Sequence, residues 1–118
     1  MKTPISFERL VEGMEFTWKK AFAKEPTDVS RNRVYCTTIL DELSRHCDSG
    51  PLFPPGVVVH NLGADFKSDV VFEAEYKFVL RLHTKIEWGH RKHTVFRVVV
   101  ENSQGKVCTL GQIGLYFP

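Results

Sequence analysis

Residues 72–88 read FEAEYKFVLRLHTKIEW, and the chemical class of the side chain changes at almost every step. The even positions are apolar except for Thr84, whereas the odd positions carry a charge or an imidazole except for Val79. Because successive side chains of a strand point to opposite faces, this alternation predicts one strand whose apolar face includes Ile86 and Trp88. The strand would be about three times the usual length of five to six residues, so we expect it to curve around another element.

Length and composition describe a chain without special features. Its 118 residues suffice for one domain, 1–118, with a core that needs no disulfide or structural metal. A net charge of +2 gives no field that favours nucleic acid, and no apolar run approaches the roughly 20 residues that cross a membrane. The amino-terminal residues have an acid at Glu8 and lack the apolar run of a signal peptide. We therefore expect a cytoplasmic protein with reduced thiols.

One segment has the periodicity of a helix. Cys36, Ile39, Leu40, Leu43 and Cys47 lie at i, i+3, i+4, i+7 and i+11, which gathers them on one stripe. We expect this stripe, including both cysteines, to face the core. The remaining apolar segments are predicted strands, at residues 14–22, 57–62, 94–101 and 106–117.

The predicted order is strand, helix and four strands, of which the last three form a meander. One buried helix against a long, curved antiparallel sheet is an α+β arrangement. This is the layout of the hotdog fold, in which the sheet wraps around a central helix. A cystatin-like or NTF2-like cone is the alternative architecture, but it would place more helix ahead of the sheet than this chain offers.

Three stretches resemble hotdog enzymes that act on acyl thioesters, in particular the MaoC-like hydratases. They are residues 6–17 (SFERLVEGMEFT), 66–72 (FKSDVVF) and 102–108 (NSQGKVC). The resemblance implies a substrate carried on coenzyme A or on an acyl carrier protein, with no other cofactor. It also implies a homodimer or a larger even assembly, or pairing with a second hotdog subunit, because hotdog subunits join their sheets edge to edge.

The catalytic motif of those hydratases, Asp-x-Asn-Pro-[Ile/Leu]-His, is not preserved. The nearest stretch is 30–35 (SRNRVY), in which Asn32 matches while Ser30, Arg33 and Tyr35 replace the Asp, Pro and His. Neither serine nor tyrosine serves easily as an acid/base group near neutral pH. The sequence therefore predicts that the fold is retained and that the standard hydratase chemistry is not.

Residues 34–38 (VYCTT) also resemble the start of the central helix in single-hotdog thioesterases, including the fluoroacetyl-CoA type. In that alignment the expected helix acid falls at Arg45, and Asp41 and Glu42 are close but displaced. On a helical wheel Tyr35, Glu42 and His46 lie along one flank of the buried stripe, and Asp41 lies near the other.

Glu42 and His46 are four residues apart and can touch, so together they could polarise a water for attack on a thioester. The alternative is an exposed i,i+4 pair without catalytic meaning.

His60 and Asn61 interrupt the apolar run of residues 57–62. We expect this strand to be buried, where polar side chains need partners, so both residues are candidates to bind the thioester or its water. The alternative is a histidine bonded to a backbone carbonyl, with Asn61 at the start of a bulge.

A basic turn follows the long strand and contains His90, Arg91 and Lys92. Such side chains suit the phosphates of coenzyme A or of phosphopantetheine, although a solvent-facing charged turn is the simpler interpretation. His90 and His93 have no third ligand in view, so no metal site is predicted.

The favoured hypothesis is a thioesterase in which Glu42 or Asp41 orients water with help from His46 or His60. Asn61 or an N–H at the start of the helix would stabilise the oxyanion. One alternative is a hydratase or dehydratase with an acid/base pair drawn from Tyr35, His60 and Asp65. The other is a non-catalytic module that binds an acyl ligand or a partner.

Overall fold

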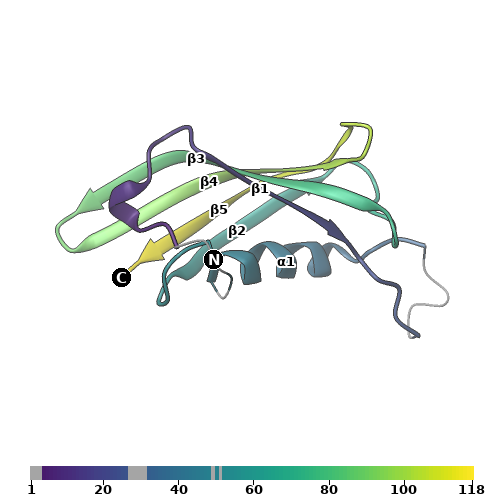
Figure 1. Cartoon of the computed structure of the whole chain (residues 1–118), viewed down its shortest axis with the longest axis horizontal. Helices are drawn as coiled ribbons and strands as arrows, with labels where there is room; N and C mark the ends of the chain where they lie inside the picture. Colours follow the sequence, from purple (N-terminus) through teal and green to yellow (C-terminus); the bar gives the residue numbers. More distant parts are fainter. Residues whose placement is uncertain (1–3, 27–31, 49, 51) are drawn as a thin grey trace.

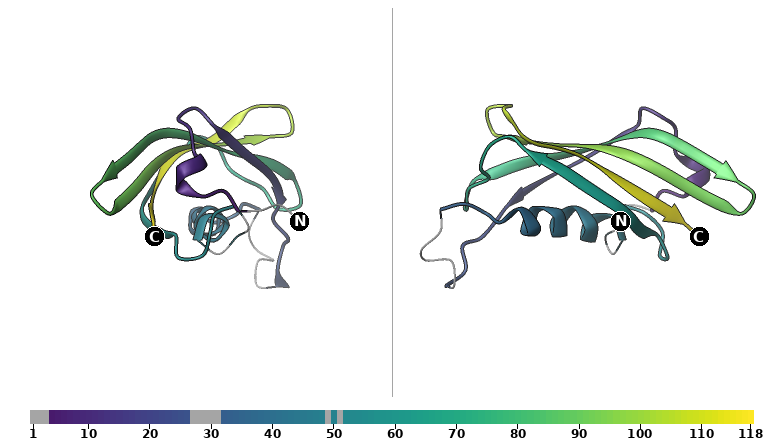
Figure 2. Two further views of the ribbon diagram at one scale, coloured as in Figure 1. Left: turned by 60° about the vertical axis from the view of Figure 1, so that its left-hand side comes forward. Right: turned by 180° about the vertical axis from the view of Figure 1, so that it is seen from behind.

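The computed structural model describes residues 4–26, 32–48, 50 and 52–118, in which one sheet curves around one helix (Figures 1 and 2). Ser30 of the hydratase-like stretch, and Ser49 and Pro51 beyond the helix, lie outside the described residues. In chain order the elements are η1 (Phe7–Arg9), β1 (Glu15–Ala21), α1 (Cys36–Asp48), β2 (Val58–Phe66), β3 (Glu75–Trp88), β4 (Arg91–Asn102) and β5 (Val107–Phe117).

The five strands are antiparallel and lie in the order β1-β3-β4-β5-β2, so β1 and β2 form the two edges. The inner face of the sheet packs on α1, and the two surfaces together make the core. Ile39, Leu43 and Cys47 supply the helix side, as the stripe predicted. The sheet supplies fully buried side chains, among them Phe78, Leu80, Leu82, Phe96, Val98, Ile113 and Leu115. The predicted α+β layout, with a final meander of β3, β4 and β5, is confirmed.

The alternation predicted for residues 72–88 continues only as far as Leu82. The pairing of β3 with β4 shifts between Leu82 and Thr84, so that His83 is an extra residue in β3. Such a bulge moves every later side chain to the opposite face. Ile86 and Trp88 are accordingly 45% and 80% exposed. The expectation that they belong to the apolar face is wrong.

Lys85 takes an inner position instead. It pairs with Thr94, which is fully buried, and its Nζ donates to the carbonyl of Leu10 at 2.9 Å. The same Nζ lies 4.7 Å from the centre of the Phe7 ring. The ammonium group therefore closes the inner face at this end of the sheet, where the alternation predicted an apolar side chain.

The long strand also begins later than predicted, at Glu75 rather than at residue 72. Glu73 has a φ of +63°, a left-handed conformation that a strand cannot contain. Its N–H donates to the carbonyl of Phe22, and its Oε1 accepts from the N–H of Lys24. Residues 72–74 are therefore a turn that ties the segment after β1 to the start of β3.

The expectation that residues 57–62 form a buried strand is wrong. β2 extends from Val58 to Phe66 and is an edge strand, with Val58, His60 and Asn61 exposed. The register with β5 shifts between Val59 and Asn61, which places His60 in a bulge. A short apolar run does not distinguish an edge strand from a central one, because strand order is decided by distant segments.

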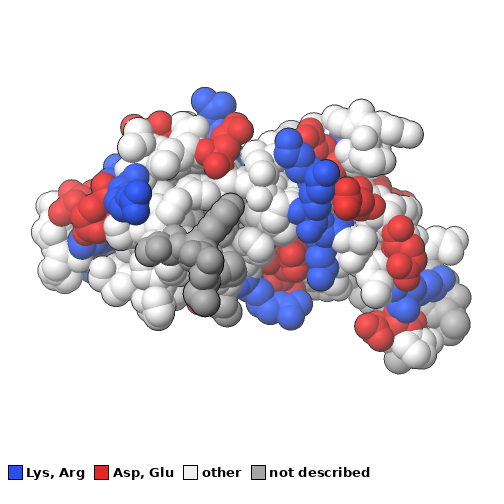
Figure 3. Space-filling model, viewed as in Figure 1, with Lys and Arg blue, Asp and Glu red and all other residues white. Residues whose placement is uncertain are grey.

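Charged side chains on the outer surface alternate in sign. On the face shown in Figure 3, acidic and basic groups lie next to one another. The ion pairs Lys19–Glu75 and Arg81–Glu15 each have an N···O distance of 3.6 Å, and both partners of each pair are exposed. No helix of the described chain is long and apolar enough to span a membrane.

Candidate functional site

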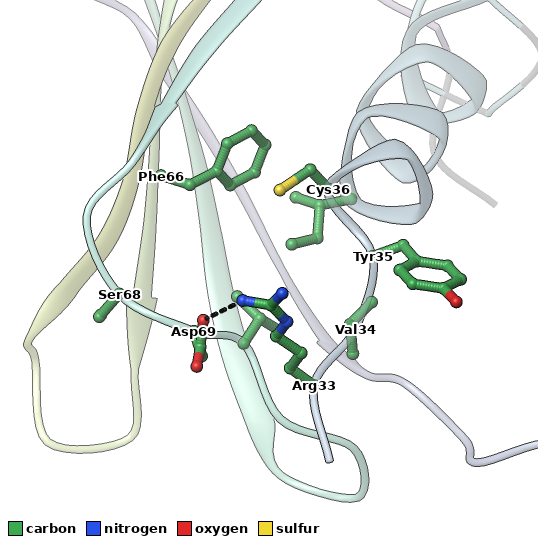
Figure 4. Close-up of a pocket in the computed structure, with 9 residues that line it drawn as sticks. Arg33, Val34, Tyr35, Cys36, Phe66, Ser68 and Asp69 are labelled. Carbon is green, nitrogen blue, oxygen red and sulfur yellow. Dashed lines mark ion pairs between the residues drawn. The ribbon is translucent and has the colours of Figure 1, made fainter. Parts of the chain in front are cut away.

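A cavity of about 140 Å³ opens where α1 begins (Figure 4). One wall is the segment that leads into the helix, and the other is the end of β2 with the residues that follow it. The first wall contributes Arg33, Val34, Tyr35, Cys36 and Ile39, and the second contributes Phe66, Ser68, Asp69 and Val70. The first wall includes three positions of the hydratase-like stretch, residues 33–35.

Backbone pairing holds the two walls together. The N–H of Val34 donates to the carbonyl of Val70 at 2.7 Å, and Arg33 forms a β-bridge with Val71. Across the mouth, Nη1 of Arg33 lies 3.5 Å from Oδ1 of Asp69. Both side chains are about two-thirds exposed, so this ion pair contributes little stability and its carboxylate is accessible from solvent.

The start of α1 carries N–H donors that are unpaired among the described residues. The carbonyl of Tyr35 accepts hydrogen bonds from the N–H groups of Thr38 and Ile39, and these two bonds form the first helical turn. The N–H groups of Cys36 and Thr37 have no acceptor among the described residues. A helix N-terminus with free N–H groups carries a partial positive charge and stabilises an oxygen that gains negative charge.

Cys36 and Tyr35 occupy different sides of this region. Figure 4 shows the Cys36 sulfur turned toward the ring of Phe66, whereas the Tyr35 ring points away from the cavity. The prediction that Cys36 faces the core is wrong, because it begins the helix at the rim of the sheet and is exposed. The helical spacing placed it on the correct stripe but could not show that the core ends before it.

Glu42 and His46 were predicted to act on water, and both are half-buried and in contact with Trp18 of β1. Nε1 of Trp18 donates to Oε2 of Glu42 at 3.0 Å. The indole stacks on the His46 ring, with centroids 3.7 Å apart and planes 4° apart. Burial lowers the pKa of His46, and the charge of Glu42 opposes that shift. Both side chains therefore contact the same indole.

Asp41 lies apart from both groups. Its Oδ2 accepts from Nη2 of Arg45 at 2.7 Å, one helical turn later, and both side chains are mostly exposed. This is the ordinary i,i+4 pair of a solvent-facing helix surface.

His60 and Asn61 do not face the helix. Both are exposed, and the His60 ring lies on the outer face of the sheet, stacked on Tyr116 with a centroid distance of 4.1 Å. Within one chain they therefore do not meet Tyr35, Glu42 or the cavity.

The predicted phosphate-binding residues lie at the hairpin between β3 and β4, beside a second cavity of about 380 Å³. His90 and Arg91 are exposed. Nζ of Lys92 instead donates to Oε1 of Glu8 at 2.6 Å, and this contact raises the pKa of Lys92 and lowers that of Glu8. The hairpin and the start of α1 lie at opposite ends of a molecule about 50 Å long (Figure 1).

Sequence reasoning missed three participants in these arrangements. Trp18 lies in the predicted strand at residues 14–22, and its indole N–H was a signal that a buried partner is needed. Asp69 lies within the stretch 66–72, and no local signal links it to Arg33. The contact between His60 and His93 joins residues 33 positions apart and has no sequence signature.

Comparison with known proteins shows the fold alone. No known family matches the sequence as a profile, and no curated protein matches it by sequence. The (R)-hydratase from A. caviae involved in PHA biosynthesis superposes with a TM-score of 0.74 at 14% identity, over 92% of this chain and 98% of that one. R-hydratase PhaJ1 from Pseudomonas aeruginosa gives 0.68 at 16% identity, over 95% and 84%.

A protein from Thermus thermophilus described as a thioesterase superfamily member gives a TM-score of 0.65 at 16% identity, over 90% of this chain and 82% of that one. The chain therefore has the hotdog fold, as its sequence predicted. Proteins with similar structures include both hydratases and a thioesterase superfamily member.

Proposed function

We propose that this protein binds acyl thioesters of coenzyme A or of an acyl carrier protein and hydrolyses them at the cavity where α1 begins. The observation that carries the proposal is that the first residue of α1, an apolar wall and one carboxylate line a single opening. The fold, shared with hydratases and a thioesterase superfamily member, supports the substrate class.

In this proposal the carbonyl oxygen of the thioester accepts hydrogen bonds from the N–H groups of Cys36 and Thr37. These donors strengthen as negative charge develops on the oxygen, so they favour the tetrahedral intermediate over the substrate. Phe66 provides the apolar surface beside the acyl group. The proposed step draws on no metal or additional cofactor.

Asp69 supplies the base. Its carboxylate accepts a proton from a water that attacks the carbonyl carbon, and the intermediate then collapses with cleavage of the carbon–sulfur bond. The departing thiolate takes up the proton, which leaves a carboxylic acid and a free thiol. Arg33 orients the carboxylate and is a positioning residue in this scheme.

The other predicted residues do not act on the thioester in this proposal. Glu42 and His46 fix Trp18 and hence the angle between β1 and α1. His60, Asn61 and the basic hairpin are too far from the cavity to serve it within one chain. They would reach a thioester only if a second hotdog subunit placed them there, in the even assembly that the resemblance implies.

Binding without turnover is the second candidate. One observation favours it, namely that the only carboxylate at the described cavity is already paired with Arg33. A hydratase is less well supported, because Tyr35 replaces the motif histidine and its ring points away from the cavity.

The test is incubation with acetyl-, hexanoyl- and dodecanoyl-CoA, with free coenzyme A measured by chromatography so that Cys36 cannot consume a thiol reagent. We expect release that falls at least about 100-fold in Asp69→Asn, the usual size of a lost general base. Glu15→Gln is the matched control, since Glu15 also pairs with an exposed arginine, 3.6 Å away on the outer face.

Ligand-induced thermal stabilisation without release would support the binding module. Equal loss of activity in Asp69→Asn and Glu15→Gln would overturn the proposed site. So would wild-type protein that neither releases coenzyme A from any of the three thioesters nor is stabilised by them.

A further inference from the structure

Two histidines meet on the outer face of the sheet, away from α1 and from the proposed thioester site. His60 of β2 and His93 of β4 approach each other with their Nε2 atoms 2.5 Å apart. The Tyr116 ring of β5 lies between their strands, with centroids 4.1 Å from His60 and 5.1 Å from His93. Three strands therefore contribute to one aromatic cluster.

The local backbone allows this approach. The bulge between Val59 and Asn61 places His60 outside the regular ladder of β2. Its ring then crosses β5 above Gly114, where a side chain would interfere because a Cβ would lie 2.7 Å from the His60 Nε2. Tyr116 supports the flat face of the ring at an angle of 25°. The convergence thus rests on a bulge, a glycine and a stacked ring together.

We propose that His60 and His93 bind a divalent transition-metal ion such as Zn²⁺ through their Nε2 atoms. Imidazole nitrogen is a common ligand for such ions, and two such nitrogens already lie next to each other. Two Zn–N bonds of about 2.0–2.1 Å at a tetrahedral angle separate the nitrogens by about 3.3 Å. The rings must therefore move apart by about 0.8 Å, which an exposed bulge on an edge strand permits.

The protein supplies only two ligands in this site. Among the described residues no third histidine, cysteine or carboxylate joins the pair. At least two tetrahedral positions are thus left for water or for a ligand from outside the chain, which is the open coordination of a site that exchanges ligands. The sequence predicted no metal site, and His90 at the hairpin turn is not part of this one; the second histidine beside His93 is His60.

The test is a titration of untagged protein with Zn²⁺. Binding is measured by calorimetry and, separately, by competition with a chromogenic chelator. We expect one ion per histidine pair, and affinity at least about tenfold weaker in His60→Gln and in His93→Gln, since each removes one of two protein ligands. His83→Gln is the control, because His83 is also an outer-face histidine of a bulge but contacts Arg97 instead.

Gly114→Ala tests the geometry without removal of a ligand, and we expect it to weaken Zn²⁺ binding while both histidines remain. Thermal unfolding of every variant without metal separates lost binding from lost folding. No saturable binding by folded wild type, or equal binding by wild type and both glutamine variants, would show that the pair is only a hydrogen bond between two rings. None of these outcomes depends on thioester hydrolysis.

Discussion

The indole of Trp18 lies parallel to the imidazole of His46, with 3.7 Å between ring centroids, while its Nε1 donates to Glu42. The hydrogen-bond acceptor Glu42 and the stacked ring of His46 are one turn apart on α1, and the indole comes from edge strand β1. One side chain thus joins the edge of the sheet to the flank of the helix, close to the fully buried Phe78.

Removal of this hydrogen bond should destabilise the fold. We expect Glu42→Ala to lower the free energy of unfolding by about 1–2 kcal/mol, because it leaves the half-buried indole N–H without its acceptor. Glu42→Gln retains an acceptor and should cost less. Urea unfolding measures both. Asp41→Ala, on the solvent side of the same helix, should change stability by no more than about 0.5 kcal/mol. Equal effects of the Glu42 and Asp41 changes to alanine would contradict the assignment.

His46 should make stability depend on pH. Burial lowers its pKa in the folded state below the ordinary value of 6.5, which the unfolded chain retains. The unfolded state therefore binds more protons as the pH falls through 6.5, so stability decreases toward acid and is fully present above that value. The measurement is the free energy of unfolding of wild type and of His46→Gln between pH 8 and about pH 5. The two values should differ most at neutral pH and become similar in acid. Parallel curves would show that His46 is not responsible.

The bulge at His83 reverses which side chains stabilise the end of β3. The Lys85 amine donates to the Leu10 carbonyl and lies near the Phe7 ring. Lys85→Ala should therefore lower the free energy of unfolding by about 1–2 kcal/mol. Trp88 is 80% exposed, so Trp88→Ala should change the free energy of unfolding by no more than about 0.5 kcal/mol. Plain alternation from residue 72 to residue 88 predicts the opposite order. Denaturant unfolding of the two variants decides between these registers.

This contrast also marks how far sequence could predict the fold. The period of two predicts β3 up to Leu82, and the stripe of Ile39, Leu43 and Cys47 predicts the helix and its buried face. One inserted residue has no signature in composition, yet it changes the face of every residue after it. Strand order is likewise decided by pairing over long distances, which is why His60 was expected inside and lies outside.

The candidate site was predictable to a smaller extent. The resemblance directed attention to residues 30–35, and Arg33, Val34 and Tyr35 do line the cavity. The partner wall comes from Phe66, Ser68 and Asp69, more than 30 positions later, and no periodicity links the two segments. The helical wheel placed Glu42 and His46 on one flank correctly, but their contact with Trp18 depends on the pairing of β1 with β3.

The three cysteines should differ sharply in reactivity, and that difference can report on the cavity. Cys36 is exposed beside Phe66, whereas Cys47 and Cys108 are buried, and burial raises the pKa of Cys47 to about 12. Because only a thiolate attacks such reagents, a disulfide reagent such as dithiobis-nitrobenzoate should modify one thiol quickly in the folded protein and all three after unfolding. Cys36→Ser should abolish the fast phase.

An acyl-CoA that occupies the cavity should slow modification of Cys36 in wild type, whereas coenzyme A without an acyl group should protect it less. Mass spectrometry of the alkylated protein identifies the modified residue. Protection with unchanged thermal stability of Cys36→Ser would place the acyl group beside this helix end independently of turnover. Modification of Cys36 at the same rate with and without every acyl-CoA would remove the cavity from consideration as the thioester site, even if hydrolysis were observed.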